Sequence, residues 1–301
     1  MRDYSFRYHQ GQPPPRKKSR FLIIVFIVAT IIFGSFMLRK PSVSNDIPNF
    51  GKKSVADLVN TEIPNLLSQE PGVYTIYIYD IQNNIGYGIG EKTTMTAASV
   101  NKVPILATLY HLAGIGEIDL ERTVVTQKED IQDYGTGSIR YEEPGKTYSV
   151  KTLARLMMQK SDNTAAYILS THILGVKKIQ ELTNSWGLIQ TNIEKNSSSP
   201  SDMGLLLLKM YKGEITNQAL TLEMLEFMTN SDFEDRIPTG VPHEVEVYHK
   251  TGDEVAKIHD VGIIDKKGHP YILAIFTSEM SDNERTKRIM AEISRKVYTA
   301  F

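Results

Sequence analysis

Cysteine is absent from the 301 residues of this chain. Its absence excludes disulfide bonds, thiolate metal sites and a cysteine nucleophile, but it is compatible with export because many exported domains of this size need no disulfide. The histidines lack metal-ligand spacing such as His-Glu-x-x-His. A glycine-rich nucleotide loop is missing too, since the glycines of residues 86–90 lie in a predicted hairpin strand with no helix start after them. We therefore expect neither a metal nor a cofactor.

A catalytic histidine dyad is also not expected. His259 and Asp260 are adjacent, but neighbouring residues in a strand point to opposite faces, so a structural role is predicted for both.

The formal net charge of -1 hides an uneven distribution of charge along the chain. Residues 1–53 carry ten Lys or Arg against two Asp or Glu, which leaves 24 against 33 for residues 54–301. The acidic remainder argues against nucleic acid or an anionic membrane surface as its main partner. We expect no nucleic-acid partner.

Residues 21–38 form a long apolar run, interrupted only by Thr30, Gly34 and Ser35. As a helix this run would be about 27 Å long, close to the roughly 30 Å hydrocarbon core of a bilayer. The basic residues before it are Arg2, Arg7, Arg16, Lys17, Lys18 and Arg20, whereas only Arg39 and Lys40 follow closely. This bias predicts a single-pass transmembrane helix with residues 1–20 as a cytoplasmic tail and the rest of the chain extracytoplasmic, in the cell membrane.

The alternative is a cleaved signal peptide, because the run is short and preceded by basic residues. No small-x-small site follows cleanly at residues 33–36, and no lipobox cysteine exists. The anchor is therefore favoured. Residues 39–53 are a polar linker, and the globular part, 54–301, begins at Ser54, a predicted N-cap for a helix over 55–67.

Strand patterns lie at both ends of the globular part. Alternation predicts a hairpin from strands 73–80 and 85–89, and three later strands at 245–251, 258–264 and 271–277. Helical patterns cover 99–112, 150–159, 164–174, 176–186, 201–211 and 220–228, and an amphipathic helix over 283–298 closes the chain. This order predicts one sheet built from the N- and C-terminal parts, with an all-helical subdomain at about 93–236 inserted between them.

Ser99 and Lys102 are three residues apart, so on a helix their side chains share one face. A serine nucleophile needs an adjacent base, and Lys102 serves only if its pKa falls from about 10.4 to near 7. A helix dipole, burial and a second ammonium such as Lys250 would all lower that pKa. Ser-x-x-Lys by itself is weak, because it should occur by chance roughly once in a chain of this size.

Ser161, Asp162 and Asn163 lie between two helical patterns. Ser161 is a candidate proton relay, and Asn163 could hydrogen-bond a substrate amide carbonyl. Helix capping is the alternative, because these residue types are the preferred N-caps. The same triplet recurs at residues 281–283, before the last helix, where capping explains it fully.

Lys250, Thr251 and Gly252 end a predicted strand. Lys250 and Thr251 are candidates for binding a substrate carboxylate, and Gly252 would let a substrate approach the backbone closely. The backbone N–H groups of Ser99 and Asp253 could form an oxyanion hole. Alternatively, a lysine on an edge strand is ordinary protection against aggregation.

Taken in this order, Ser-x-x-Lys, Ser-Asp-Asn and Lys-Thr-Gly resemble the signature of class A serine β-lactamases and the related penicillin-binding proteins. The matching flanks are residues 98–104, 159–166, 237–242 and 259–263. The resemblance implies an α/β (α+β) fold of the β-lactamase/transpeptidase type, with an antiparallel sheet flanked by helices.

One departure from the family concerns deacylation. Class A β-lactamases carry a Glu-x-x-x-Asn element that positions the hydrolytic water, whereas the corresponding stretch here, 186–200, is shortened and lacks this spacing. Glu194 is the only acid of that stretch and the sole candidate for a deacylation base; a solvated loop carboxylate is the alternative.

The sequence therefore predicts a membrane-anchored serine hydrolase, acting as a monomer, that forms an acyl-enzyme on Ser99 with β-lactams or cell-wall peptide-like substrates. One alternative is a penicillin-binding D-Ala-D-Ala carboxypeptidase or esterase that deacylates slowly. A further alternative is a non-catalytic cell-wall sensor, although retention of every acylation residue argues against it.

Overall fold

A computed structural model describes residues 54–301 of the chain, and the predicted tail, transmembrane helix and linker lie outside these residues. Within 54–301, no helix is both long enough and apolar enough to cross a membrane. The described part begins with a continuous helical stretch, made of α2 (Val55–Asp57), η1 (Leu58–Glu62) and α3 (Ile63–Leu67). Ser54 caps it as predicted, because its Oγ accepts from the Asp57 backbone while the Asp57 carboxylate accepts from the Ser54 backbone.

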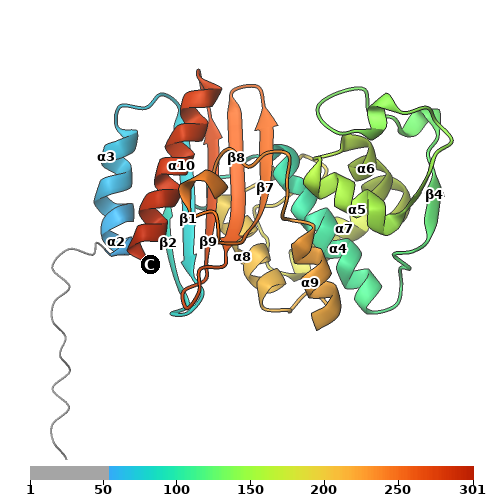
Figure 1. Ribbon diagram of the computed structural model, residues 1–301, viewed down its shortest axis with the longest axis horizontal. Coiled ribbons are helices and arrows are strands. Elements are labelled where there is room, and N and C mark those ends of the chain that lie inside the picture. The colour runs from blue at the N-terminus through green and yellow to red at the C-terminus, as the bar shows by residue number, and fades with distance from the viewer. Residues whose placement is uncertain (1–53) are drawn as a thin grey trace, which may run out of the picture. The chain divides into compact units, whose positions relative to one another are not determined.

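The centre of the structure is a five-stranded sheet in the order β2-β1-β9-β8-β7, with every neighbouring pair antiparallel (Figure 1). Its strands are β1 (Val73–Asp80), β2 (Ile85–Ile89), β7 (Val247–Glu254), β8 (Lys257–Ile264) and β9 (Tyr271–Ser278). The first and last parts of the chain meet where β1 pairs with β9 along its whole length. This confirms the predicted antiparallel sheet.

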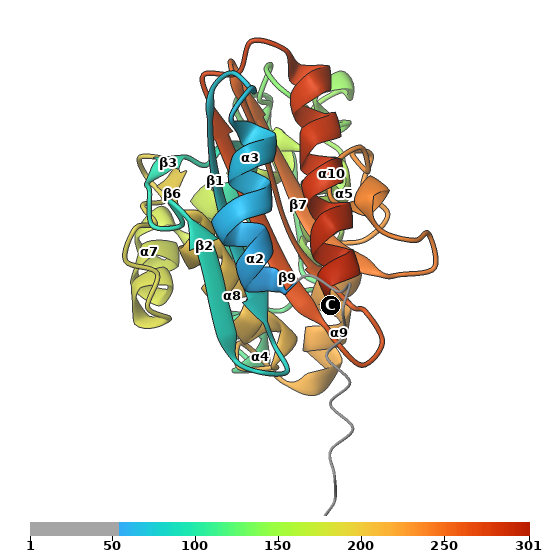
Figure 2. The ribbon, with the colours of Figure 1, turned by 90° about the vertical axis from the view of Figure 1, so that its left-hand side faces the viewer.

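Strand β9 is apolar along nearly its whole length because both of its faces are buried. Ile272, Ala274 and Phe276 face a core shared with the inserted helices, whereas Leu273 and Ile275 pack beneath the opposite layer. That layer consists of the α2–α3 stretch and α10 (Asn283–Ala300), which lie across the sheet in Figure 2. Such two-sided burial explains why this strand shows an unbroken hydrophobic run rather than alternation.

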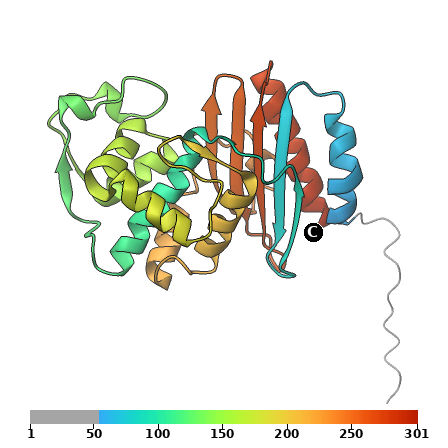
Figure 3. The same cartoon turned by 180° about the vertical axis from the view of Figure 1, so that it is seen from behind.

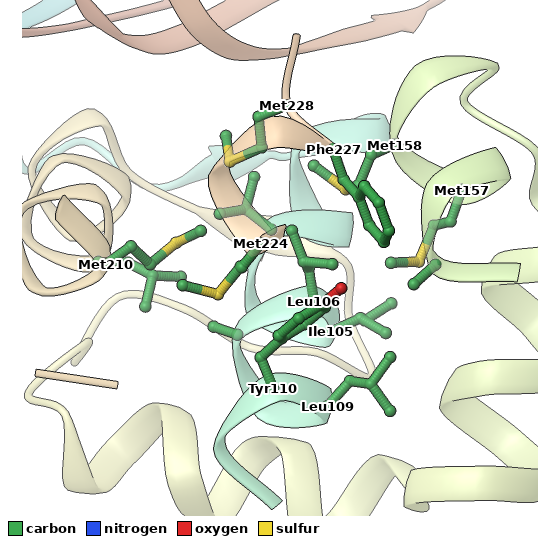
Figure 4. Close-up of a cluster of buried hydrophobic side chains, with 14 of the residues drawn as sticks. Ile105, Leu106, Leu109, Tyr110, Met157, Met158, Met210, Met224, Phe227 and Met228 are labelled. Carbon is green, nitrogen blue, oxygen red and sulfur yellow. The ribbon is translucent and has the colours of Figure 1, made fainter. Parts of the chain in front are cut away.

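The remaining helices gather on the other side of the sheet, as seen from behind in Figure 3. They are α4 (Lys102–Gly114), α5 (Val150–Gln159), α6 (Asn163–Tyr167), its π-helical continuation η5 (Ile168–Leu174), α7 (Val176–Ser185), α8 (Pro200–Tyr211) and α9 (Gln218–Glu226). Helix α8 packs directly on β1, β8 and β9, while α4 runs through the middle of the group. Leu106, Leu109 and Tyr110 of α4 lie among methionines of α5 and α9 (Figure 4).

The inserted segment is not all-helical, which corrects the prediction. Two small antiparallel sheets lie within it: β3 (Met95–Thr96) pairs with β6 (Ser197–Ser198), and β4 (Thr123–Val125) pairs with β5 (Thr147–Ser149). Strands of two or three residues are too short to show a hydrophobic alternation, so the sequence carries no signal for them. Strand β3 immediately precedes the segment that carries Ser99.

Candidate active site

Ser99 lies in a short 3-10 helix, η2 (Ala98–Asn101), between strand β3 and helix α4. Ala98 has a positive φ of 49°, a conformation that is strained for alanine. The backbone N–H of Ala97 donates to the Asn196 carbonyl at 2.8 Å, which ties this segment to the loop before β6. The tight turn leads into α4 at Lys102 and accommodates Pro104 in its first turn.

The Lys102 amino group is surrounded by four oxygen atoms. Its Nζ lies 3.1 Å from Ser99 Oγ, 3.2 Å from Ser161 Oγ, 2.6 Å from the Ser161 carbonyl and 2.8 Å from Asn163 Oδ1. Asn163 is held in this orientation because its Nδ2 donates to the Tyr134 carbonyl at 3.0 Å. The structure therefore brings Ser99, Lys102, Ser161 and Asn163 together, as the motifs predict.

This set of partners suits a neutral amine. The Ser161 carbonyl and Asn163 Oδ1 can only accept hydrogen bonds, whereas the two hydroxyls can donate or accept. A neutral amine donates its two hydrogens to the pure acceptors and keeps one lone pair for the Ser99 hydroxyl. Lys102 thereby has the geometry of a base for Ser99.

The electrostatic environment favours the same protonation state. Burial lowers the pKa of Lys102 well below its usual value, and the nearby Lys250 ammonium lowers it further, while Asp162 acts in the opposite direction. Only 5% of Lys102 is exposed. Of the expected influences, burial thus acts more strongly than the second ammonium.

Asp162 caps helix α6 and also binds the loop at residues 138–139. Its Oδ1 accepts from the Ala165 backbone at 2.9 Å, whereas its Oδ2 accepts from Ser138 and Ile139 at 2.7 and 2.9 Å. In the second triplet, Asp282 caps α10 through the Arg285 backbone. In the first triplet, Asp162 therefore caps the helix, whereas Ser161 and Asn163 contact Lys102.

Residues 132–139 enclose the first triplet, which sequence reasoning did not foresee. Thr136 Oγ1 donates to the Ser161 carbonyl at 2.8 Å, and the Thr136 carbonyl accepts from the Asn163 backbone at 3.1 Å. Ser161 itself has a positive φ of 49°. The strained serine is therefore held from both sides, and Gly137, with φ of 122°, lies against Asp162 where a Cβ would collide. Gly135 and Gly137 are the only sequence signal for this loop.

Strand β7 lies directly against η2, and Gly252 lies at this contact. A Cβ on Gly252 would lie 2.9 Å from the Ala97 carbonyl and 3.2 Å from the Val100 backbone nitrogen. Gly252 is not part of the cavity wall. The missing side chain therefore allows the strand to approach the Ser99 segment closely.

Lys250 is 1% exposed and also does not line the cavity, although Thr251 and Asp253 do. Its Nζ donates to the Thr251 carbonyl at 3.0 Å. Burial lowers the pKa of Lys250 to about 7, with Asp260 acting against this and Arg236 reinforcing it.

A network of polar side chains near Lys250 was missed by sequence reasoning. His249 Nδ1 lies 2.9 Å from Asp260 Oδ1, and Arg236 makes two 2.8 Å bonds to the Asp253 carboxylate. Asp260 raises the pKa of His249 to about 9 despite burial. His259 points elsewhere, to the Thr96 carbonyl at 2.9 Å, so the adjacent His259 and Asp260 diverge as predicted. Strand pairing across the sheet creates this network, and the spacing of these residues along the chain does not predict it.

These elements border a cavity of about 550 Å³. Its walls include Ser99, Lys102, Tyr134, Ser161, Asn163, Tyr167, Ile193, Asn196, Phe233, Thr251, Asp253 and Glu254. Glu194 is exposed and does not line the cavity, so the structure does not bring the candidate deacylation base to Ser99. Its neighbour Ile193 faces the cavity instead. Within 54–301, no group of acidic or histidine side chains is arranged to hold a metal ion.

A family model described as the beta-lactamase enzyme family matches residues 58–301. The chain belongs to this family. Beta-lactamase ROB-1 of Haemophilus influenzae is 20% identical over 251 residues, which cover 78% of this chain and 81% of that protein. Family membership, together with the site geometry, makes the chain a serine β-lactamase-like hydrolase.

Solved structures of the beta-lactamase fold support this assignment. PBP-A is 26% identical and superposes with a TM-score of 0.77 over 83% of this chain and 97% of that one. A PBP-A mutant solved as an acyl-enzyme complex with penicillin G is also 26% identical, with a TM-score of 0.76, and covers 83% and 98% of the two chains. The beta-lactamase of Sphaerobacter thermophilus is 21% identical, with a TM-score of 0.75 over 80% and 96%, and so shows the shared fold.

Proposed function

We propose that this hydrolase forms an acyl-enzyme on Ser99 with β-lactams or cell-wall peptide-like amides and esters. The observation that carries the proposal is the buried Lys102 amine, 3.1 Å from Ser99 Oγ and held by two pure acceptors. The proposed roles are base for Lys102, proton relay for Ser161, substrate amide contact for Asn163, carboxylate binding for Lys250 and Thr251, and backbone oxyanion stabilisation for Ser99 and Asp253.

Acylation follows from these contacts. Lys102 Nζ takes the Ser99 proton as Oγ attacks the substrate carbonyl carbon, and the carbonyl oxygen becomes an oxyanion. When the intermediate collapses, the bond to the leaving nitrogen or oxygen breaks. The proton on Lys102 passes through the Ser161 hydroxyl, 3.2 Å away, to that leaving atom. The products are the acyl-Ser99 ester and a neutral leaving group.

Slow deacylation is the second part of the proposal. Two carboxylates line the cavity, and both are engaged: Asp253 with Arg236 at 2.8 Å and Glu254 with Lys257 at 3.2 Å. Hydrolysis of the ester requires a base that activates water. The absence of a free carboxylate from these walls favours a penicillin-binding carboxypeptidase or esterase over an efficient β-lactamase.

A fluorescent penicillin tests acylation. The wild type and Ser170→Ala, which removes another hydroxyl of the same cavity, should be labelled, while Ser99→Ala should not. Equal labelling of Ser99→Ala, or no labelling of the folded wild type, would reject the proposal. With nitrocefin, one equivalent of product followed by a stall supports slow deacylation, whereas sustained fast turnover supports a β-lactamase.

We also propose that the chain is held in the membrane by residues 21–38, with the catalytic domain outside the cytoplasm and acting as a monomer. The support is the apolar run and the basic residues before it. Mass spectrometry of the membrane fraction should detect peptides from residues 1–20 on the same chain. A mature N-terminus beyond Leu38 would contradict the anchor.

A further inference from the structure

Glu254 is the last residue of β7, and its place along that strand is on the acyl side of the reacting bond. The proposed carboxylate contact, Thr251, and the proposed oxyanion donor, the Asp253 N–H, precede it in this order. The leaving group of a substrate therefore lies toward Thr251, and its acyl group extends past Asp253 toward Glu254. Since a strand rises about 3.3 Å per residue, Glu254 is within reach of an acyl side chain.

The side chain of Glu254 belongs to the face of β7 that meets the Ser99 segment. Residues two apart in a strand share a face, and a Cβ on Gly252 would lie 2.9 Å from the Ala97 carbonyl, next to that segment. Glu254 lies on this face too, opposite Lys257 of β8 in the strand register. Its position in the cavity wall agrees with this placement.

The cavity wall carries a negative charge that no cation of the wall balances. Apart from tyrosines, the ionisable residues among its lining residues within 54–301 are Lys102, Asp253 and Glu254. Burial lowers the pKa of Lys102 and so favours its neutral form. Arg236 neutralises Asp253 through two hydrogen bonds of 2.8 Å. The charge that remains is that of Glu254.

The present partner of Glu254 is a weak competitor for this charge. Glu254 Oε2 lies 3.2 Å from Lys257 Nζ, and 44% of the Glu254 side chain and 26% of the Lys257 side chain are exposed. Ion pairs at such exposed positions contribute about 0 to 1 kcal/mol. Both groups are hydrated when the pair opens, so an ammonium group on a substrate can replace Lys257 at little cost.

We propose that Glu254 is a specificity-determining residue, which makes the site favour acyl donors that carry a positively charged amino group on the acyl portion. This inference rests on the proposed acylation of Ser99 and leaves Lys250 and Thr251 as the carboxylate site for the leaving group. The preferred substrate is then zwitterionic, with an ammonium group on one side of the reacting carbonyl and a carboxylate on the other. Glu254 attracts the acyl chain and takes no part in bond making.

The test compares two thioesters that differ in one charge. Both have an acetyl-lysyl-D-alanyl acyl group and a thioglycolate leaving group, and the lysine side-chain amine is free in one and acetylated in the other. Thiol release with the enzyme in excess reports acylation alone, whatever the rate of deacylation. In the wild type, the charged donor should acylate Ser99 about fivefold faster than the neutral donor, as expected for one partly exposed ion pair.

Substitutions in the pair should change this ratio of charged to neutral acylation rates in opposite directions. Glu254→Gln should reduce it to about one, and Glu254→Lys should reduce it below one, because the attraction is removed or reversed. Lys257→Gln removes the competing cation and should raise the ratio about twofold. Glu117→Gln is the matched control, since it removes an exposed carboxylate outside the cavity wall, and it should leave the ratio unaltered.

Two results would overturn the inference while leaving the acylation of Ser99 in place. The first is a wild-type ratio near one, or an unchanged ratio in both Glu254 variants with melting temperatures near that of the wild type. The second is an equal fall of the ratio in Glu117→Gln, which would assign the preference to the overall charge of the domain. Failure of both thioesters to acylate the wild type would instead count against the proposed function.

Discussion

Replacing Lys250 by methionine should stabilise the protein at neutral pH while removing part of the proposed carboxylate site. Lys250 is 1% exposed, and within 54–301 no carboxylate lies within ion-pair distance of its Nζ. Burial lowers its pKa from 10.5 to about 7. Since the unfolded chain binds the proton far more tightly than the folded one, folding at neutral pH is opposed by proton release from this group.

The size of this penalty follows from the shift in the pKa of Lys250. At about 1.4 kcal/mol per pKa unit, the Lys250 penalty is about 4 kcal/mol at pH 7, about 2 kcal/mol at pH 9 and near zero above the unfolded-state pKa. The penalty is complete below the folded pKa of about 7 and disappears as pH rises toward 10.5. Lys250→Met has no such term, so its advantage over the wild type should shrink by about 2 kcal/mol between pH 7 and pH 9.

Urea unfolding of residues 54–301, followed by circular dichroism at both pH values, measures this difference. The other titrating groups are common to both proteins, so their contributions to the difference in stability largely cancel. Lys92→Met, at an exposed position, reports the same substitution without burial. A stability difference between Lys250→Met and the wild type that is the same at both pH values, or larger at pH 9, would refute the reasoning.

Three further predictions concern the same site. Gly252→Ala should slow labelling by penicillin about tenfold or more. The added methyl group would lie 2.9 Å from the Ala97 carbonyl and would force β7 away from the Ser99 segment. An unaffected labelling rate would contradict this prediction. Asp162→Ala should lower the free energy of unfolding in urea by about 3 kcal/mol, because three backbone N–H groups lose their acceptor. Asp282→Ala removes only a helix cap and should lower it by about 1 kcal/mol. Equal losses in the two variants would show that the two triplets are equivalent. The acylation rate with a carboxylated ester should fall as pH rises through about 7, because Lys250 loses its charge there, and a neutral ester measured in parallel should lack that decline.

The elements of the fold were predictable where the pattern is local. Strands 73–80 and 85–89 and the helix over 150–159 were placed at the bounds that the structure has, because alternation and helical periodicity report which side chains must be buried. Strands of two or three residues carry no such pattern, so β3, β4, β5 and β6 were not foreseen.

The acylation residues were predictable as a set because their order along the chain matches a family signature. Their surroundings were not. The enclosure of Ser161 by Thr136 and the pairing of His249 with Asp260 join residues of different elements, 25 and 11 positions apart. The close approach of Gly252 to the Ser99 segment was not predicted for the same reason: only the packing of β7 on η2 shows what lies against this glycine.

By itself, the sequence determined the chemical inventory of this protein: two serines, two lysines and an amide in family order, no thiol, and no acid at the expected deacylation spacing. Tertiary structure alone decided how strongly burial acts on Lys102 and Lys250 and which residues enclose Ser161. The physical reason is that desolvation and access depend on the groups that surround a side chain in space, and these come from strands and loops far apart along the chain.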